Sequence, residues 1–215
     1  MTGPPGAPPP QNPPYTAAAF AEATGVSRET LALLEGYAAL LVKWQKAINL
    51  VAPDSLPDLW RRHMLDSAAL FPLIPATART LVDLGSGAGF PGLVLAIMGV
   101  PEVHLVESDT RKCAFLSEGA RLFAPGRVTV HRTRIEAAPA IAADVVTARA
   151  LADLTKLLAY AAPFLAPDGI CLFPKGRRVE DELTLAKQTW TMAVERVANP
   201  ADPSGIILRI KGLAR

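Results

Sequence analysis

The sequence predicts an α/β protein with a mostly parallel sheet, preceded by a helical segment. From Arg79 onward, short apolar strand-like runs alternate with stretches of helical periodicity. This alternation is typical of a parallel sheet covered by helices on both faces. Before that point the apolar residues recur at three- and four-residue steps, which indicates helices. We therefore expect a disordered proline-rich tail at 1–14, a helical extension at 15–75 and an α/β domain at 76–215.

The tail holds seven of the 20 prolines of the chain and no charged side chain, a composition typical of disordered or polyproline segments. In the extension, Ser27 is expected to cap a helix that carries apolar residues from Leu34 to Ile48. Asp54 or Ser55 is expected to cap the next helix, with Pro57 in its first turn. That helix would carry residues 60–67.

The α/β part contains seven expected strands and four expected helices. The strands are expected at 80–84, 103–107, 128–131, 144–148, 169–173, 193–198 and 206–211. The helices are expected at 91–98, 110–123, 153–165 and 179–191. No long helix separates the last two strands, so we expect them to form an antiparallel hairpin at one edge of the sheet.

Bulk properties limit the class of function. The 215 residues carry a net charge of +2, too little for a protein that coats nucleic acid, so a polyanion would have to bind a local basic patch. The two cysteines, Cys113 and Cys171, form no metal-binding spacing, which favours a reduced, cytoplasmic setting. We expect no metal, no signal peptide, no membrane span and a monomeric protein.

A glycine-rich turn follows the first strand and is the strongest signal in the chain. Gly85, Gly87, Gly89 and Gly92 lie within eight residues, and Asp83 stands two residues before the first of them. Such spacing indicates a tight turn or a close approach of backbone to ligand. In one register the turn matches the G-x-G-x-x-G fingerprint of dinucleotide-binding proteins. In the other it resembles motif I of the methyltransferases that use S-adenosylmethionine (AdoMet), in which an acid precedes G-x-G-x-G.

Charge favours the second register. A dinucleotide brings a pyrophosphate, which the carboxylate of Asp83 would repel, whereas AdoMet carries an ammonium and a sulfonium that suit a carboxylate. The sequence therefore predicts a Rossmann-like AdoMet-dependent methyltransferase fold. An NAD(P)-linked oxidoreductase and a module that binds AdoMet without turnover remain the alternatives.

Further candidates follow the other strands, because ligands of open α/β sheets bind at the carboxyl ends of the strands. Glu107 ends the second strand about 20 residues past the glycines, where an acid binds ribose hydroxyls. Ile135 and Glu136 follow the third strand and could hold adenine. Arg149 and Lys175 place cations after the fourth and fifth strands, where they could bind a carboxylate, a phosphate or a guanine edge.

Missing features narrow the chemistry of the methyl acceptor. No cysteine lies in the strand-end context that attack from pyrimidine C5 requires. Asn12-Pro13-Pro14-Tyr15 spells the N-P-P-Y of enzymes that methylate exocyclic or amide nitrogens, but it lies in the tail, where no strand precedes it. Guanine N7 needs neither device, because it already has an in-plane lone pair. Catalysis at N7 would rest mainly on positioning and desolvation.

Three sequence blocks resemble the RsmG family, also called GidB. They are Leu41 to Leu50 (LVKWQKAINL), Arg62 to Ser67 (RHMLDS) and Val82 to Gly92 (VDLGSGAGFPG), followed by Thr147 to Ala150 (TARA) and Lys175-Gly176. The family comprises bacterial 16S rRNA guanine-N7 methyltransferases of the small ribosomal subunit. The resemblance implies AdoMet contacts at Gly85, Phe90, Glu107, Ser108, Asp109, Ile135, Glu136 and Arg149, which add to Asp83 and Gly87.

The resemblance also implies a partner, 16S rRNA or the small subunit, and a set of RNA-facing or site-shaping residues: Asn49, Arg62, His63, Lys175 and Arg177. Arg149 and Lys175 are the candidates for a catalytic role. A small-molecule acceptor remains the alternative within the methyltransferases. The sequence does not fix which guanine is modified.

Overall fold

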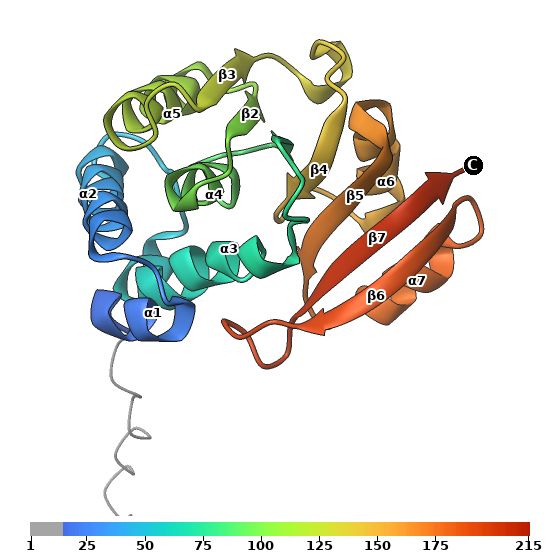
Figure 1. Ribbon diagram of the computed structural model, residues 1–215, viewed down its shortest axis with the longest axis horizontal. Helices are drawn as coiled ribbons and strands as arrows, with labels where there is room; N and C mark the ends of the chain where they lie inside the picture. The colour runs from blue at the N-terminus through green and yellow to red at the C-terminus, as the bar shows by residue number, and fades with distance from the viewer. Residues whose placement is uncertain (1–14) are drawn as a thin grey trace, which may run out of the picture.

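The computed structural model describes residues 15–215 and contains one seven-stranded sheet (Figure 1). The strands follow the order β3-β2-β1-β4-β5-β7-β6. Their bounds are β1 Thr80–Leu84, β2 Glu102–Glu107, β3 Val128–Arg132, β4 Ala143–Ala148, β5 Leu165–Lys175, β6 Thr191–Ala198 and β7 Ile206–Ala214. Each of the seven strands lies where the sequence predicts one.

The strand order reverses between β1 and β4, and this reversal positions the site. The chain first builds outward from β1 through β2 to β3, and then returns to place β4 and β5 on the other side of β1; all these neighbours are parallel. In open α/β sheets such a reversal leaves a crevice beyond the carboxyl ends of the adjacent strands. The ends of β1, β2 and β4 therefore surround the expected binding region.

The predicted antiparallel hairpin at one edge of the sheet is confirmed. β6 and β7 form it, and β7 lies between β5 and β6 and is antiparallel to both. The strand at the edge is β6. After β5, helix α7 (Val179–Ala186) leads the chain to β6, which lies one strand position away from β5. The chain then turns back, and β7 fills the position between them.

Helices cover both faces of the sheet. Their bounds are α1 Ala17–Thr24, α2 Arg28–Gln45, α3 Asp66–Ala68, α4 Gly92–Met98, α5 Thr110–Phe123 and α6 Leu154–Ala161, besides α7. Short 3₁₀ turns lie at Pro53–Asp58, Phe71–Leu73, Ile135–Ala137 and Ala162–Phe164, and a π-helical turn lies at Trp60–Leu65. No helix within residues 15–215 is long and apolar enough to cross a membrane.

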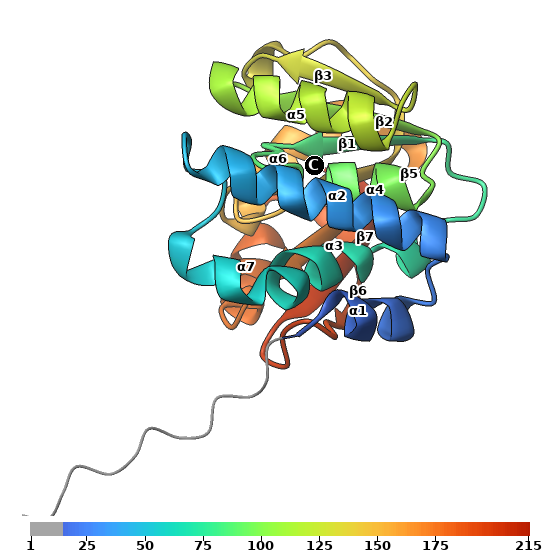
Figure 2. The ribbon, with the colours of Figure 1, turned by 90° about the vertical axis from the view of Figure 1, so that its left-hand side faces the viewer.

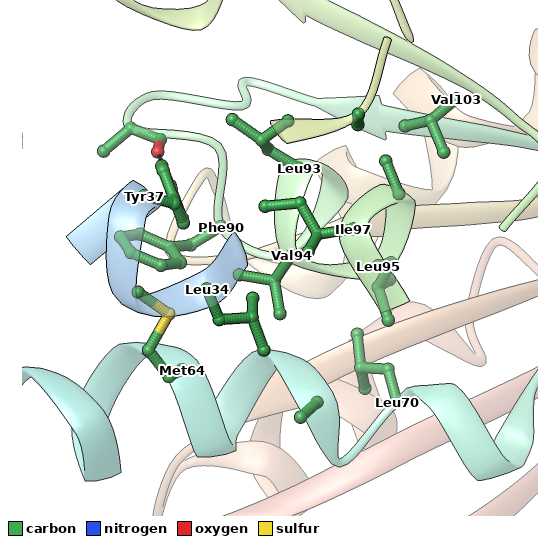
Figure 3. Packing of buried hydrophobic residues seen from close by; sticks show 14 of the residues in the cluster. Leu34, Tyr37, Met64, Leu70, Phe90, Leu93, Val94, Leu95, Ile97 and Val103 are labelled. Carbon is green, nitrogen blue, oxygen red and sulfur yellow. Dashed lines mark hydrogen bonds between the residues drawn. The ribbon is translucent and has the colours of Figure 1, made fainter. Parts of the chain in front are cut away.

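The helical extension shares a hydrophobic core with one face of the sheet. Phe20, Leu34 and Tyr37 of the extension pack in the same buried cluster as Leu81 of β1 and Leu93 of α4. Figure 3 shows Tyr37 and Met64 beside Phe90 and Leu34 beside Val94 of α4, and Figure 2 views the molecule from this side. A second cluster, on the opposite face, joins the sheet to α6 and α7.

Three helix predictions need correction. Ser27 caps α2 as predicted, but neither Asp54 nor Ser55 caps the next helix. Pro57 lacks the N–H that a regular helix needs, and the segment forms a 3₁₀ turn followed by a π-helical turn.

Helix α6 ends at Ala161 rather than 165, because β5 already begins at Leu165. Helix α7 ends at Ala186 rather than 191, and the chain then turns to bury Trp190.

Candidate functional site

The glycine turn after β1 is held against the end of β2. Gly85, Gly87 and Gly89 have φ values of 65°, 56° and 85°, a left-handed conformation that favours glycine. The N–H groups of Gly85 and Ser86 both donate to the carbonyl of Val106, at 2.9 and 3.1 Å. The turn therefore has a fixed path across the ends of both strands.

Asp83 lies beneath this turn and not in a cleft. Its side chain is fully buried; it accepts a hydrogen bond from the Thr147 hydroxyl at 2.8 Å and one from the Gly92 N–H at 3.3 Å. Burial raises the pKa of this carboxyl to about 6. The prediction that Asp83 faces a positively charged ligand needs correction, because the carboxylate instead ties β1 to β4 and to the start of α4.

Glu107 lies at the rim of the turn. One carboxylate oxygen accepts the Gly87 N–H at 2.9 Å, and the other accepts the N–H groups of Ser108 and Asp109 at 2.8 Å each. Asp109 in turn caps α5: its carboxylate accepts hydrogen bonds from the backbone N–H groups of Arg111 and Lys112. The carboxylate of Glu107 thus connects the glycine turn to the end of β2.

A cleft of about 290 Å³, which we call the glycine-turn cleft, opens beside these residues. Six of the predicted residues line it: Gly85, Gly87, Glu107, Ser108, Ile135 and Glu136. Leu151 closes one side, packed so closely on Gly85 that a Cβ at residue 85 would lie 2.7 Å from Leu151 Cδ1. The cleft therefore combines bare backbone, apolar side chains and two carboxylates, and it is also lined by three cations: Lys112, Arg134 and Lys156.

A larger cleft of about 970 Å³, the strand-end cleft, lies over the ends of β4 and β5. Residues 58–66 and 199–203 bound it on the sides. Within the part of the chain that the structure describes, Leu151 is the only residue that lines both clefts. The two spaces therefore meet at one apolar side chain.

Arg149, at the start of the β4–α6 loop, is held in the strand-end cleft by three acceptors. Its Nη1 donates to the Arg62 carbonyl at 2.9 Å and to Asp66 Oδ2 at 3.3 Å, and its Nη2 lies 2.8 Å from His63 Nδ1. The guanidinium also lies over the Phe90 ring, 5.1 Å from its centre. These contacts fix the plane of the guanidinium.

His63 is an internal, neutral residue. Because arginine can only donate, Nδ1 of His63 must be the acceptor, which leaves the proton on Nε2, 2.8 Å from the Ser55 hydroxyl. Burial and the neighbouring cations Arg149 and Arg62 lower the pKa of His63 to about 3. A direct RNA contact by His63 is therefore not what the structure provides.

Lys175 is paired inside the strand-end cleft. Its Nζ donates to the Glu182 carboxylate at 2.7 Å and to the Ala152 carbonyl at 3.0 Å. The same Glu182 oxygen accepts the Leu154 N–H at 2.8 Å. Lys175 and Glu182 thus hold the backbone directly after Leu151, at Ala152 and at Leu154.

The charges of the strand-end cleft nearly cancel. Five basic residues line it: Arg61, Arg62, Arg149, Lys175 and Arg178. Six acidic residues line it as well: Asp58, Asp66, Asp153, Asp181, Glu182 and Asp202. Three of the cations form ion pairs with three of the acids. Within residues 15–215, Arg62 and Arg178 are the lining cations without an ion pair.

Comparison with known proteins identifies the family. The family model for GidB, described as rRNA small subunit methyltransferase G, matches residues 30–204. The chain belongs to the GidB family. A ribosomal RNA small subunit methyltransferase G of Paramagnetospirillum magneticum is 61% identical over 192 residues, which cover 89% of this chain and 93% of that protein. One of Rhodospirillum centenum is 61% identical over 203 residues, covering 94% and 93%.

Solved structures agree on the fold of this GidB-family chain. A ribosomal protein L11 methylase of Lactobacillus delbrueckii subsp. bulgaricus superposes with a TM-score of 0.54 at 20% identity, over 68% of this chain and 76% of that one. M. jannaschii TYW2 in complex with AdoMet gives a TM-score of 0.52 at 17% identity, over 69% and 73%. The predicted family and the predicted Rossmann-like methyltransferase fold are both confirmed.

Four further predicted residues of the GidB-family chain line neither cleft. Phe90 is buried, stacked on His63 and beside Tyr37. Asp109 caps α5, as described above. Asn49 and Arg177 are exposed but line neither cleft. Arg149, expected at the cofactor, lines only the strand-end cleft. The N-P-P-Y segment falls on residues 1–14 except for Tyr15, and so lies outside the described residues.

Sequence reasoning missed four residues that the structure places in the site. All four line the strand-end cleft: Asp66, Leu151, Glu182 and Asn199. Asp66 contacts Arg149, Glu182 contacts Lys175, and Asn199 contacts Asp66. Asp66 lies within the family block at 62–67, which was the one available signal. The other three contact residues that are distant in the sequence, and the sequence around each of them gives no sign of these contacts.

Proposed function

We propose that this protein transfers a methyl group from AdoMet to N7 of a guanine in the 16S rRNA of the small ribosomal subunit. The observation that carries the proposal is the meeting of two chemically different clefts at Leu151. One cleft suits a nucleoside and the other presents a fixed guanidinium. The family relationship supports the same reaction, since the relatives carry the name ribosomal RNA small subunit methyltransferase G.

The glycine-turn cleft fits the donor. The bare backbone of Gly85 and Gly87 permits close approach, and Ile135 offers an apolar surface for a flat base. The Glu107 carboxylate has three backbone donors and about four lone-pair sites. It therefore retains capacity for ribose hydroxyls, and can take both if the Gly87 bond is exchanged. AdoMet would supply an electrophilic methyl group on its sulfonium.

The strand-end cleft fits the acceptor nucleotide. Arg149 presents a guanidinium held in one plane, which suits a phosphate or a purine edge. Guanine N7 needs no base to remove a proton, and the histidine beside Arg149 is not placed to act as one: His63 is buried, neutral and engaged on both nitrogens. The work of the chain would be to position the base and to exclude water.

The test uses small ribosomal subunits from cells that lack this protein. Purified protein and AdoMet labelled in the methyl group are added, and the RNA is digested and its nucleosides are separated. We expect label in N7-methylguanosine. Label elsewhere in the RNA would refute N7, and label only in small molecules of a cell extract would favour the small-molecule alternative. Protection of the protein by NADH but not by AdoMet would favour the oxidoreductase.

A further inference from the structure

Asn199 joins three distant segments around Arg149. It is buried in the β6–β7 connection, and its Nδ2 donates to Asp66 Oδ1 at 2.6 Å. Its Oδ1 accepts the Ala201 N–H at 3.0 Å, which fixes the amide so that the nitrogen faces Asp66. The other oxygen of Asp66 accepts from Arg149 at 3.3 Å. One carboxylate thus connects the hairpin of β6 and β7 to the arginine after β4.

The guanidinium keeps donors for a ligand. Arginine has five N–H groups. Two on Nη1 and one on Nη2 point at Arg62, Asp66 and His63. The remaining two, on Nε and Nη2, have no acceptor among residues 15–215, while Arg149 lines the strand-end cleft. The direction of these two donors depends on the three contacts, and the contact with Asp66 depends in turn on Asn199.

We propose that Asn199 is a positioning residue for methyl transfer, which holds Asp66 and through it aims the free N–H groups of Arg149 into the strand-end cleft. The proposal rests on the proposed function, because it assigns Asn199 to the acceptor side of that reaction. Asn199 lies outside the sequence blocks that resemble the family. The proposal is tested with two substitutions of Asn199: in one of them a proton can restore the hydrogen bond to Asp66, and in the other it cannot.

Asn199→Asp replaces the amide donor with an oxygen 2.6 Å from a carboxylate oxygen of Asp66. Two carboxylates this close cannot both ionise readily and share one proton, which titrates as a property of the pair. Other charged or titratable groups near the pair are Arg149 after β4, Arg62 and His63 from the Asp66 segment, and Asp202 of the cleft. His63 stays neutral above about pH 3.

We expect Asn199→Asp to lower the rate of methyl transfer at saturating AdoMet and RNA by about tenfold or more at pH 8. The ratio of variant to wild-type rate should rise as the pH falls toward 5.5, because the shared proton restores a hydrogen bond to Asp66. Asn199→Ala should be equally slow at pH 8 and should show no such recovery. AdoMet affinity by calorimetry should stay within about twofold in both variants.

Gln188→Glu is the matched control. It makes the same amide-to-carboxylate change at an exposed position after α7 that lines neither cleft, and should leave the rate and its pH profile unchanged. Asp66→Asn combined with Asn199→Asp reverses donor and acceptor, and should be faster at pH 8 than Asn199→Asp alone. Thermal unfolding of each variant, recorded at both pH values, reports whether it is folded.

A wild-type rate in folded Asn199→Ala, or an Asn199→Asp profile parallel to that of the wild type, would overturn the proposal. So would a loss of AdoMet affinity equal to the loss of rate. If the wild type itself transferred no methyl group to the subunit, the proposed function would fail instead. The pH dependence of Asn199→Asp unfolding would then still report on the carboxylate pair.

Discussion

The ammonium of Lys175 lies 2.7 Å from the carboxylate of Glu182, and each partner also binds the backbone of the loop between β4 and α6. Lys175 holds the Ala152 carbonyl and Glu182 holds the Leu154 N–H. Leu151, the side chain that separates the two clefts, is carried by this loop. The ion pair is therefore a clamp on the junction of the clefts.

Lys175→Met should loosen this clamp. We expect AdoMet affinity to stay within about twofold and methyl transfer to fall at least tenfold, because the junction would no longer be held in one position. Loss of a charge-assisted contact should also cost about 1–3 kcal/mol of unfolding free energy. The control is Lys187→Met, at an exposed lysine directly after α7, the helix that carries Glu182. Equal losses of AdoMet binding and transfer would place Lys175 at the cofactor instead.

Glu107→Ala should weaken AdoMet binding by about 1.5–3 kcal/mol, because it removes a charged acceptor for ribose hydroxyls and frees the Gly87 N–H. Isothermal calorimetry measures the change. Glu102→Ala, at the other end of the same strand, should have no such effect. Unchanged AdoMet affinity in Glu107→Ala would remove this residue from the donor site.

Gly85→Ala should cost stability and AdoMet affinity together. The backbone at φ 65° costs an L-residue about 1–2 kcal/mol, and the new methyl group would push Leu151 toward the clefts. Gly25→Ala has the same φ with no atom within 4 Å of its Cβ, so it should lose stability alone. Leu151→Ala in the Gly85→Ala background should recover part of the affinity, and failure to do so would exclude the steric cause.

Because the pKa of His63 is lowered in the folded protein, the free energy of unfolding should decrease as the pH falls. The folded pKa of about 3 lies below the ordinary value of 6.5, so between these values the unfolded chain binds more protons than the folded one. Its contribution is complete above pH 6.5 and declines as the pH falls toward 3, by at most about 1.4 kcal/mol per unit. Denaturant unfolding of wild type and His63→Gln from pH 4.5 to 8 should show their difference narrowing in acid. A constant difference would mean that His63 titrates normally.

RNA binding should depend on salt only moderately, because three of the five cations in the strand-end cleft are paired. Arg62→Ala and Arg178→Ala should each raise the KM for RNA. Each should also reduce the slope of log KM against log salt by about 0.7–0.9 if the residue contacts a phosphate. Arg121→Ala, on an exposed part of α5, should change neither. A slope unchanged in both cleft variants would place the RNA elsewhere.

The sheet could be predicted from the sequence because its signals are local. Runs such as Leu81 to Leu84 alternate their side chains between the two cores, and the glycines after them mark the turn. The order of β7 and β6 could not be predicted, because either strand of a hairpin can pair with β5. The irregular turns around Pro57 were missed because a helical period survives there while the hydrogen bonds change.

Site residues could be predicted from the sequence only where their position depends on their own strand and the turn after it. Glu107 ends β2, Gly85 and Gly87 follow β1, and Ile135 comes shortly after β3. All four line one cleft. The role of Asp83 was misjudged, because its distance from the glycines along the chain does not reveal that Thr147 and Gly92 bury it. The contacts of Arg149 with His63 and Asp66 span more than 80 residues, and no local pattern encodes them.

Leu151 has a consequence for the order of events during turnover. The two clefts share only this one side chain, so we expect a molecule in one of them to leave the other accessible. In the proposed reaction neither substrate would then have to arrive first, and the demethylated nucleoside could depart before the RNA.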